Sequence, residues 1–239
     1  MFLNAKHTAV LCFAACMSLS TSAIADIVIS GTRVIYKSDQ KSVNVRLENK
    51  GNNPLLVQSW LDTGDDSAEP GSIKVPFTAT PPVSRIDAKR GQTIKLMYTA
   101  SSPLPKDRES VFWFNVLEVP PKPDADKVAN QSLLQLAFRT RIKLFYRPAG
   151  LQGDVKTAPN ELRFTRSGNQ IRVDNPTVFN ITFNQFFAND KEIEKAGMVP
   201  AKGSLNITLP AGAGSVSKIK YNTINDFGSS AEMMTKNVD

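Results

Sequence analysis

Short runs in which hydrophobic and polar residues alternate cover most of the chain. Apolar residues occupy every second position over 43–47 and again over 94–98, and mostly apolar stretches span 55–61, 111–119 and 133–146. Clusters of glycine, proline and asparagine separate these runs. A two-residue period is typical of strands with one buried face, and short strands at this spacing predict a β-sandwich.

The same alternation resumes after Pro148-Ala149-Gly150. Apolar residues alternate with polar ones near 162–164, 171–173, 179–183, 205–209 and 216–221. The chain is long enough for two domains of about 100 residues. We therefore predict an all-β fold of two sandwich domains, over 26–148 and 149–239, with at most one or two helical turns at 191–196.

The first 25 residues have the features of a signal peptide. Lys6 supplies a positive charge, residues 8–19 are mostly apolar, and Ala23-Ile24-Ala25 is a small-residue cleavage site. We predict cleavage after Ala25 and export of the chain that begins at Asp26. A lipoprotein signal that ends before Cys16 is the alternative, but its apolar segment would be unusually short.

The exported chain would contain neither cysteine nor histidine. Cys12, Cys16 and His7 all lie in the first 25 residues. This removes Ser-His-Asp triads, cysteine nucleophiles, zinc sites with His or Cys ligands, and disulfides. The chemistry that remains would need paired carboxylates, a lysine or a metal site made of carboxylates. No motif for these accompanies the acidic residues, so we expect no catalytic residues, no metal and no cofactor.

A formal charge of +7, or +6 without Lys6, makes the protein basic. A nucleic-acid partner is not expected for an exported protein, whereas a partner that carries carboxylates fits the charge.

The stretch around residue 140 combines a hydrophobic ladder with positive charge. Leu134, Leu136 and Phe138 would share one face of a strand. The cations that follow are Arg139, Arg141, Lys143 and Arg147. Such a strand can pair with an extended peptide through its backbone, fill gaps between the peptide's side chains and hold its terminal carboxylate.

Several motifs resemble one known family over nearly all of residues 26–239. LPKDRESVFWFNVLEVPP at 104–121, RIKLFYRP at 141–148 and INDFG at 224–228 are similar to the periplasmic pilus assembly chaperones, the PapD-like family of the chaperone–usher pathway. Segments 79–83 and 175–177 support the match. The resemblance implies two immunoglobulin-like β-sandwich domains in a boomerang arrangement. It also implies that the protein binds pilus subunits by donor-strand complementation, prevents their aggregation and delivers them to an outer-membrane usher.

The resemblance also implies roles for individual residues, in three groups. Arg33 and Lys143 would anchor the subunit's C-terminal carboxylate. Leu134, Leu136 and Phe138 would be donor-strand residues. Glu109, Arg147 and Asp226 would form an ion network between the two domains.

The chain departs from the family pattern in two places. Phe138 is bulkier than the aliphatic residues common there, and the disulfide found in the second domain of some members is impossible here. The length of the 120–132 link suggests the subfamily that serves rod-like pili.

Two other functional classes remain open from the sequence. A structural or adhesin subunit built from immunoglobulin-like domains would itself need a donated strand, whereas both halves here contain enough strand signals. A hydrolase could use Glu109 and Asp226 as paired carboxylates, but no general-acid partner accompanies them. A free chaperone would expose its apolar strand, so we also expect either self-association or a mobile 120–132 link when no subunit is bound.

Overall fold

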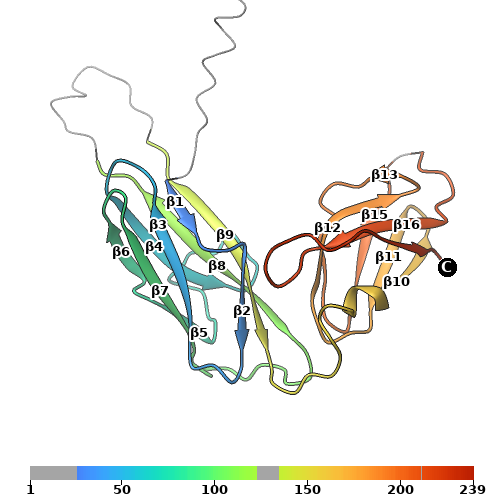
Figure 1. The fold of residues 1–239 in the computed structure, drawn as a ribbon, viewed down its shortest axis with the longest axis horizontal. Coiled ribbons are helices and arrows are strands. Elements are labelled where there is room, and N and C mark those ends of the chain that lie inside the picture. Colours follow the sequence, from blue (N-terminus) through green and yellow to red (C-terminus); the bar gives the residue numbers. More distant parts are fainter. Residues whose placement is uncertain (1–25, 123–134, 211) are drawn as a thin grey trace, which may run out of the picture.

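The computed structural model describes residues 26–122, 135–210 and 212–239 (Figure 1). Two β-sandwiches are joined at one end and diverge toward the other. The predicted signal peptide, Leu134 and most of the 120–132 link lie outside the described residues. None of the helices in the described part is long and apolar enough to cross a membrane.

The N-terminal sandwich pairs a four-stranded sheet with a five-stranded sheet. The first has the order β1 (Ile27–Ile29), β3 (Val43–Asn49), β7 (Gly91–Tyr98) and β5 (Phe77–Thr80). The second has the order β2 (Arg33–Lys37), β9 (Phe138–Arg147), β8 (Ser110–Val119), β4 (Leu55–Asp62) and β6 (Val83–Ile86). All pairs within these sheets are antiparallel except β2 with β9.

The C-terminal sandwich has a smaller set of strands. One sheet contains β10 (Arg163–Ser167), β11 (Gln170–Asn175) and β15 (Gly203–Thr208). The other has the order β13 (Lys191–Glu192), β12 (Ile181–Ala188), β16 (Lys218–Thr223) and β17 (Met234–Asn237), with β14 (Met198–Val199) also beside β12. A 3₁₀ helix, Ala158–Glu161, precedes β10.

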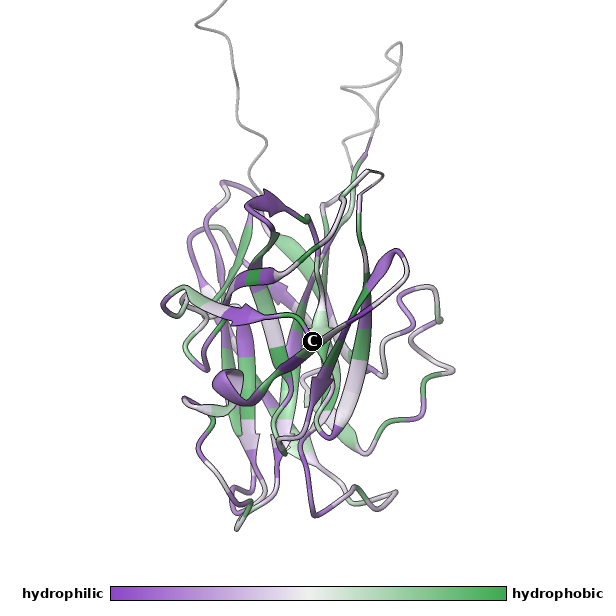
Figure 2. Cartoon of the chain, turned by 90° about the vertical axis from the view of Figure 1, so that its right-hand side faces the viewer, coloured by the Kyte–Doolittle hydropathy of each residue, from purple (hydrophilic) through white to green (hydrophobic). Residues whose placement is uncertain are grey.

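Each sandwich buries the apolar residues of the alternating runs. Ile94 and Leu96 in β7 face Leu144 in β9 across one core, and all three are fully buried. Ile171 and Ile219 occupy the second core. Hydrophobic and hydrophilic positions alternate along the ribbon of many strands (Figure 2), as expected for strands with one solvent-facing side.

The first strand of the chain changes sheets after three residues. β1 pairs with β3 in one sheet, and β2 pairs with β9 in the other. Gly31 lies between them with a φ of 115°, a backbone conformation that residues with a Cβ rarely adopt. This switch places Arg33, the first residue of β2, beside the middle of β9.

Two local predictions were wrong. Residues 191–192 form strand β13 rather than a helical turn, because Asn189 and Asp190 have φ values of 46° and 64° and close a tight hairpin from β12. Strand β9 begins at Phe138 rather than at 133, and residues 135–137 have no regular structure. Pro120 and Pro121 end β8 at that level, since proline offers no N–H to the ladder.

We expect Leu96→Ala to lower the free energy of unfolding of the N-terminal sandwich by about 2–5 kcal/mol, because it leaves a cavity in a closed core. Leu56→Ala is the matched control, since Leu56 is 49% exposed and should change stability by less than about 0.5 kcal/mol. Both tryptophans, Trp60 and Trp113, belong to this sandwich, so urea unfolding followed by tryptophan fluorescence measures it. Equal effects of the two substitutions would contradict this core assignment.

Candidate functional site

Half of strand β9 has a neighbour on one side only. β8 pairs with β9 from Phe138 to Tyr146, but β2 begins opposite Lys143. Within the described residues, no strand pairs with the other edge of β9 over 138–142. The backbone N–H and C=O groups of this open edge are therefore available to an added strand.

Arg33 and Lys143 meet where the open edge ends. They are direct partners in the parallel β2–β9 register, and both side chains are partly buried. Arg33 donates from Nη1 to the carbonyl oxygen of Ile224 at 2.9 Å, and its guanidinium lies 5.5 Å from the ring centroid of Phe145. Its buried Nε has no hydrogen-bond acceptor among the described residues.

The electrostatic environment of these two cations favours an anion. Burial lowers the pKa of Lys143, and the charges of Arg33 and Arg141 lower it further. Burial also lowers the pKa of Arg33, although Asp226 and Glu109 oppose this shift through their charges. Within the described residues, neither Arg33 nor Lys143 forms an ion pair. A carboxylate placed between them would relieve both the burial cost and their mutual repulsion.

Exposed apolar side chains lead up to this cation pair. Leu136 is 53% exposed and Phe138 is 45% exposed. Phe138 lies on the same face of β9 as the buried Ile142 and Leu144, so it continues the line of core residues beyond the core. The structure thus places Phe138 on the open edge and Leu136 just before it.

A second cluster of charged side chains joins the two domains. Arg147 donates from Nε to Glu109 at 2.6 Å, and from Nη1 and Nη2 to the two carboxylate oxygens of Asp226 at 2.7 and 2.8 Å. Glu109 also accepts from the backbone N–H of Asn180 at 2.9 Å. The guanidinium lies 5.4 Å from the ring centroid of Phe179. The structure therefore brings all three residues of the expected ion network together.

Burial shapes the acid–base properties of this network. Burial raises the pKa of Glu109, while Arg147 and the Asn180 N–H oppose that rise. Burial acts to lower the pKa of Arg147, but its two carboxylate partners outweigh this effect and raise it. Arg147 is thus permanently charged, and it needs both acids as partners in a place where its side chain is only 15% exposed.

The loop after β16 is folded so that Asp226 faces Arg147. The side-chain oxygen of Asn225 accepts from the N–H groups of Phe227 and Ser229, both at 3.0 Å. Gly228 packs so closely on the N-terminal domain that a Cβ there would lie 2.1 Å from the hydroxyl of Thr32. In Figure 1 this red loop reaches toward the N-terminal sandwich.

Two family models match the chain in succession. The model described as "Pili and flagellar-assembly chaperone, PapD N-terminal domain" matches residues 26–152. The model described as "Pili assembly chaperone PapD, C-terminal domain" matches residues 157–234. The chain belongs to the PapD-like family of pilus assembly chaperones. The expected family, the all-β fold of two immunoglobulin-like domains and the non-enzymatic role are thereby confirmed. Members of this family work in the periplasm.

Individual relatives support the same assignment. The probable fimbrial chaperone YadV of Escherichia coli K12 is 66% identical, over 97% of this chain and 98% of that protein. The crystal structure of the YadV chaperone gives a TM-score of 0.74 at 56% identity, over 89% of this chain and 100% of that one. The SafB chaperone of Salmonella enterica was solved in complex with the SafA pilin. It gives a TM-score of 0.80 at 26% identity, over 91% of this chain and 98% of that one. These relatives favour a chaperone over a fibre subunit or adhesin.

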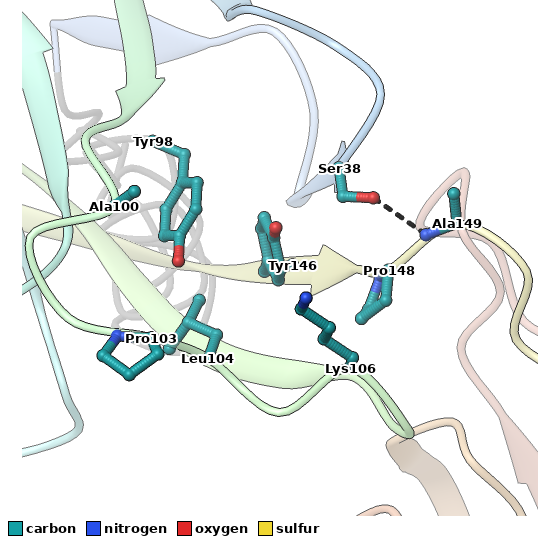
Figure 3. A pocket seen from close by; sticks show the side chains of 9 residues that line it. All are labelled: Ser38, Tyr98, Ala100, Pro103, Leu104, Lys106, Tyr146, Pro148 and Ala149. Carbon is teal, nitrogen blue, oxygen red and sulfur yellow. Dashed lines mark hydrogen bonds between the residues drawn. The ribbon is translucent and has the colours of Figure 1, made fainter.

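A separate hollow of about 380 Å³ lies where this chaperone's two domains join (Figure 3). Tyr98, Tyr146 and Lys106 line it, and the hydroxyl of Ser38 accepts from the N–H of Ala149 at 2.8 Å beside it. That bond ties the interdomain link to the end of β2. Among the described residues no cluster of three or more potential metal ligands occurs.

Sequence reasoning missed several residues around the site. The backbone N–H of Asn180 donates to Glu109, and the backbone carbonyl of Ile224 accepts from Arg33. Every residue type has these backbone groups, so the sequence does not indicate such contacts. Asp62 pairs with Arg141 across 79 positions of the chain, and no local motif indicates that contact.

We expect Asp226→Ala to loosen the angle between the two domains. Arg147 would lose a bidentate carboxylate partner in a partly buried place, which should lower the free energy of unfolding by about 1.5–3 kcal/mol. Solution scattering should show a broader distribution of interdomain distances, and the melting temperature should fall. Asp174→Ala is the matched control, because Asp174 forms an exposed pair with Arg172. An unchanged scattering profile and melting temperature for Asp226→Ala would contradict a role of this network in setting the angle.

Proposed function

We propose that this protein is a periplasmic chaperone that binds pilus or fimbrial subunits by lending them strand β9. The open edge of β9, which ends at the unpaired cations Arg33 and Lys143 of the described chain, is the observation that carries the proposal. The SafB chaperone was solved in complex with the SafA pilin, and we extend this class of partner to the present chain. An outer-membrane usher would then receive the subunit.

The direction of the added strand follows from β2. β2 runs parallel to β9 and begins at Arg33. A peptide that fills the open edge and ends with its carboxylate at Arg33 would run in line with β2, and so also parallel to β9. Its backbone would pair with residues 138–142, and its carboxylate would lie between Arg33 and Lys143.

The apolar ladder would supply the other half of the binding. Leu136 and Phe138, together with Leu134 outside the described residues, would enter the groove left by a missing strand in the subunit. Full burial of one large apolar side chain contributes roughly 1.5–3 kcal/mol. The same exposed side chains would favour self-association of the free chaperone.

Delivery to the periplasm requires an export signal. We propose that residues 1–25 form a signal peptide that is cleaved after Ala25. The proposal is supported by Lys6, the apolar stretch that follows it and the small-residue sequence Ala23-Ile24-Ala25.

We expect Arg33→Ala and Lys143→Ala each to abolish capture of a fimbrial subunit that is co-expressed with the chaperone in the periplasm. Each change removes a charge-assisted bond worth about 1.5–3 kcal/mol, or roughly 10- to 150-fold in affinity. Co-purification measures capture, and circular dichroism verifies the fold. Arg85→Ala is the control, because Arg85 is an exposed cation in the same sheet. Normal capture by both variants would contradict the carboxylate anchor.

We expect Leu136→Glu to weaken capture far more than Gln135→Glu, although both add one charge to neighbouring exposed positions. Only Leu136 would be buried in the subunit, and burying an unpaired carboxylate is costly. Hydrogen exchange over residues 135–142 gives a second measurement: subunit binding should strongly increase protection there. Protection that is already strong in the free monomer and unchanged on binding would contradict strand donation.

A further inference from the structure

The outer face of β9 carries a cation at every second position toward the anchor. Arg139, Arg141 and Lys143 project from this face, because residues two apart on a strand share a side. A peptide carboxylate that approaches the open edge thus meets a row of positive charges. A feature of the structure must therefore decide which of these cations binds the carboxylate.

Apolar patterning alone does not choose between these positions. A slip of one residue turns every apolar side chain of a strand to the wrong face, so it is excluded. A slip of two residues keeps every side chain on its original face. It would move the carboxylate from Lys143 to Arg141 and shift the whole peptide along β9. The choice between these two registers must therefore come from the charges.

Arg141 is the cation of this row that has a buried carboxylate partner. Its Nε donates to Asp62 at 3.1 Å, and its Nη2 donates to the other carboxylate oxygen. The Asp62 side chain is 3% exposed and the Arg141 side chain 20%. The guanidinium also lies 5.0 Å from the ring centroid of Trp113. Arg141 is thus held over the Trp113 ring, with Nε and Nη2 bonded to Asp62 and its charge compensated by that carboxylate.

Asp62 is held in its ionised form by further donors. The side-chain amide of Asn115 donates to it at 2.7 Å, and so does the N–H of Gly64 at 2.7 Å. Burial acts to raise the pKa of Asp62, but the bonds from Arg141, Asn115 and Gly64 outweigh this and lower it. Asp62 and Arg141 are therefore both charged, and each compensates the charge of the other before any ligand binds.

The other two cations of the row differ from Arg141. Arg139 is exposed and donates to the backbone carbonyl of Asp66 at 2.8 Å, so water screens its charge. Lys143 is partly buried beside Arg33, and within the described residues it forms no ion pair. Without Asp62, both Arg141 and Lys143 could bind an anion strongly. With Asp62 in place, only the position at Lys143 remains.

We propose that Asp62 determines the register of the bound subunit by neutralising Arg141, so that a terminal carboxylate binds only at Arg33 and Lys143. This inference rests on the proposed strand donation and adds a specificity-determining residue to it. Asp62 does not touch the subunit and acts through Arg141, so it is a positioning residue. Arg141 freed from Asp62 would create a second anion site two residues upstream.

Disulfide cross-linking can measure the register directly. Residues 26–239 contain no cysteine, so Thr140→Cys introduces a single thiol on the open edge. The probes are two nine-residue peptides with alternating leucine and threonine and a free carboxylate. One carries cysteine at the third residue from its end, which lies beside position 140 when the carboxylate is at Lys143. The other carries it at the last residue, which lies there after a two-residue slip.

We expect the Thr140→Cys protein, with Asp62 and Arg141 unchanged, to cross-link mainly to the first peptide. Adding Asp62→Asn should raise the share of cross-links to the second peptide about tenfold or more. Adding Arg141→Gln to Asp62→Asn should restore the original preference, because the competing cation is gone. A merely structural role of Asp62 predicts no such rescue. Arg141→Lys, which keeps the charge but not the two-pronged contact, should give an intermediate rise and serves if Asp62→Asn does not fold.

The outcomes separate this inference from the proposed function. If amidation of the peptide's carboxylate leaves cross-linking to the Thr140→Cys protein, with Asp62 and Arg141 unchanged, unaffected, the carboxylate anchor itself is wrong. If amidation matters but Asp62→Asn and Arg141→Lys keep the original preference, the role of Asp62 is overturned. A double variant that behaves like Asp62→Asn alone would also overturn it.

Discussion

The unpaired edge of β9 is the constraint on which this chaperone depends. Backbone N–H and C=O groups need partners, and a sheet edge that lacks them attracts another strand. Here the described chain covers the second half of β9 with β2 and leaves residues 138–142 uncovered. The sheet switch at Gly31 sets the length of that opening, because it fixes where β2 begins.

The two domains are placed by contacts that cross between them close to this edge. Arg147 holds Glu109 of its own sandwich and Asp226 of the other, and Arg33 reaches the carbonyl of Ile224. The same loop of the second domain thus contacts both the ion network and the anchor cation. Loosening the network would therefore also disturb the position of Arg33, and under the proposed function this would weaken subunit binding.

Charge along β9 is graded by what surrounds each cation. Water screens Arg139, Asp62 compensates Arg141, and Lys143 is partly buried without an anionic partner among the described residues. In the proposed function, an added carboxylate would therefore bind at Lys143. Three cations on one strand face are equivalent in a sequence, but they differ in a fold because solvent exposure and buried partners decide how strongly a charge acts.

The sequence by itself determined the strand pattern, the two sandwiches and the family, because a two-residue apolar period and contiguous motifs are local signals. It also pointed to Arg33, Lys143, Leu136 and Phe138. The start of β9, the hairpin at Asn189 and the partner of Arg141 were decided only by the tertiary structure. Each depends on residues distant along the chain or on backbone geometry: where β8 stops, how a turn closes, and which acid lies under a guanidinium. Such contacts arise from packing, and no local periodicity encodes them.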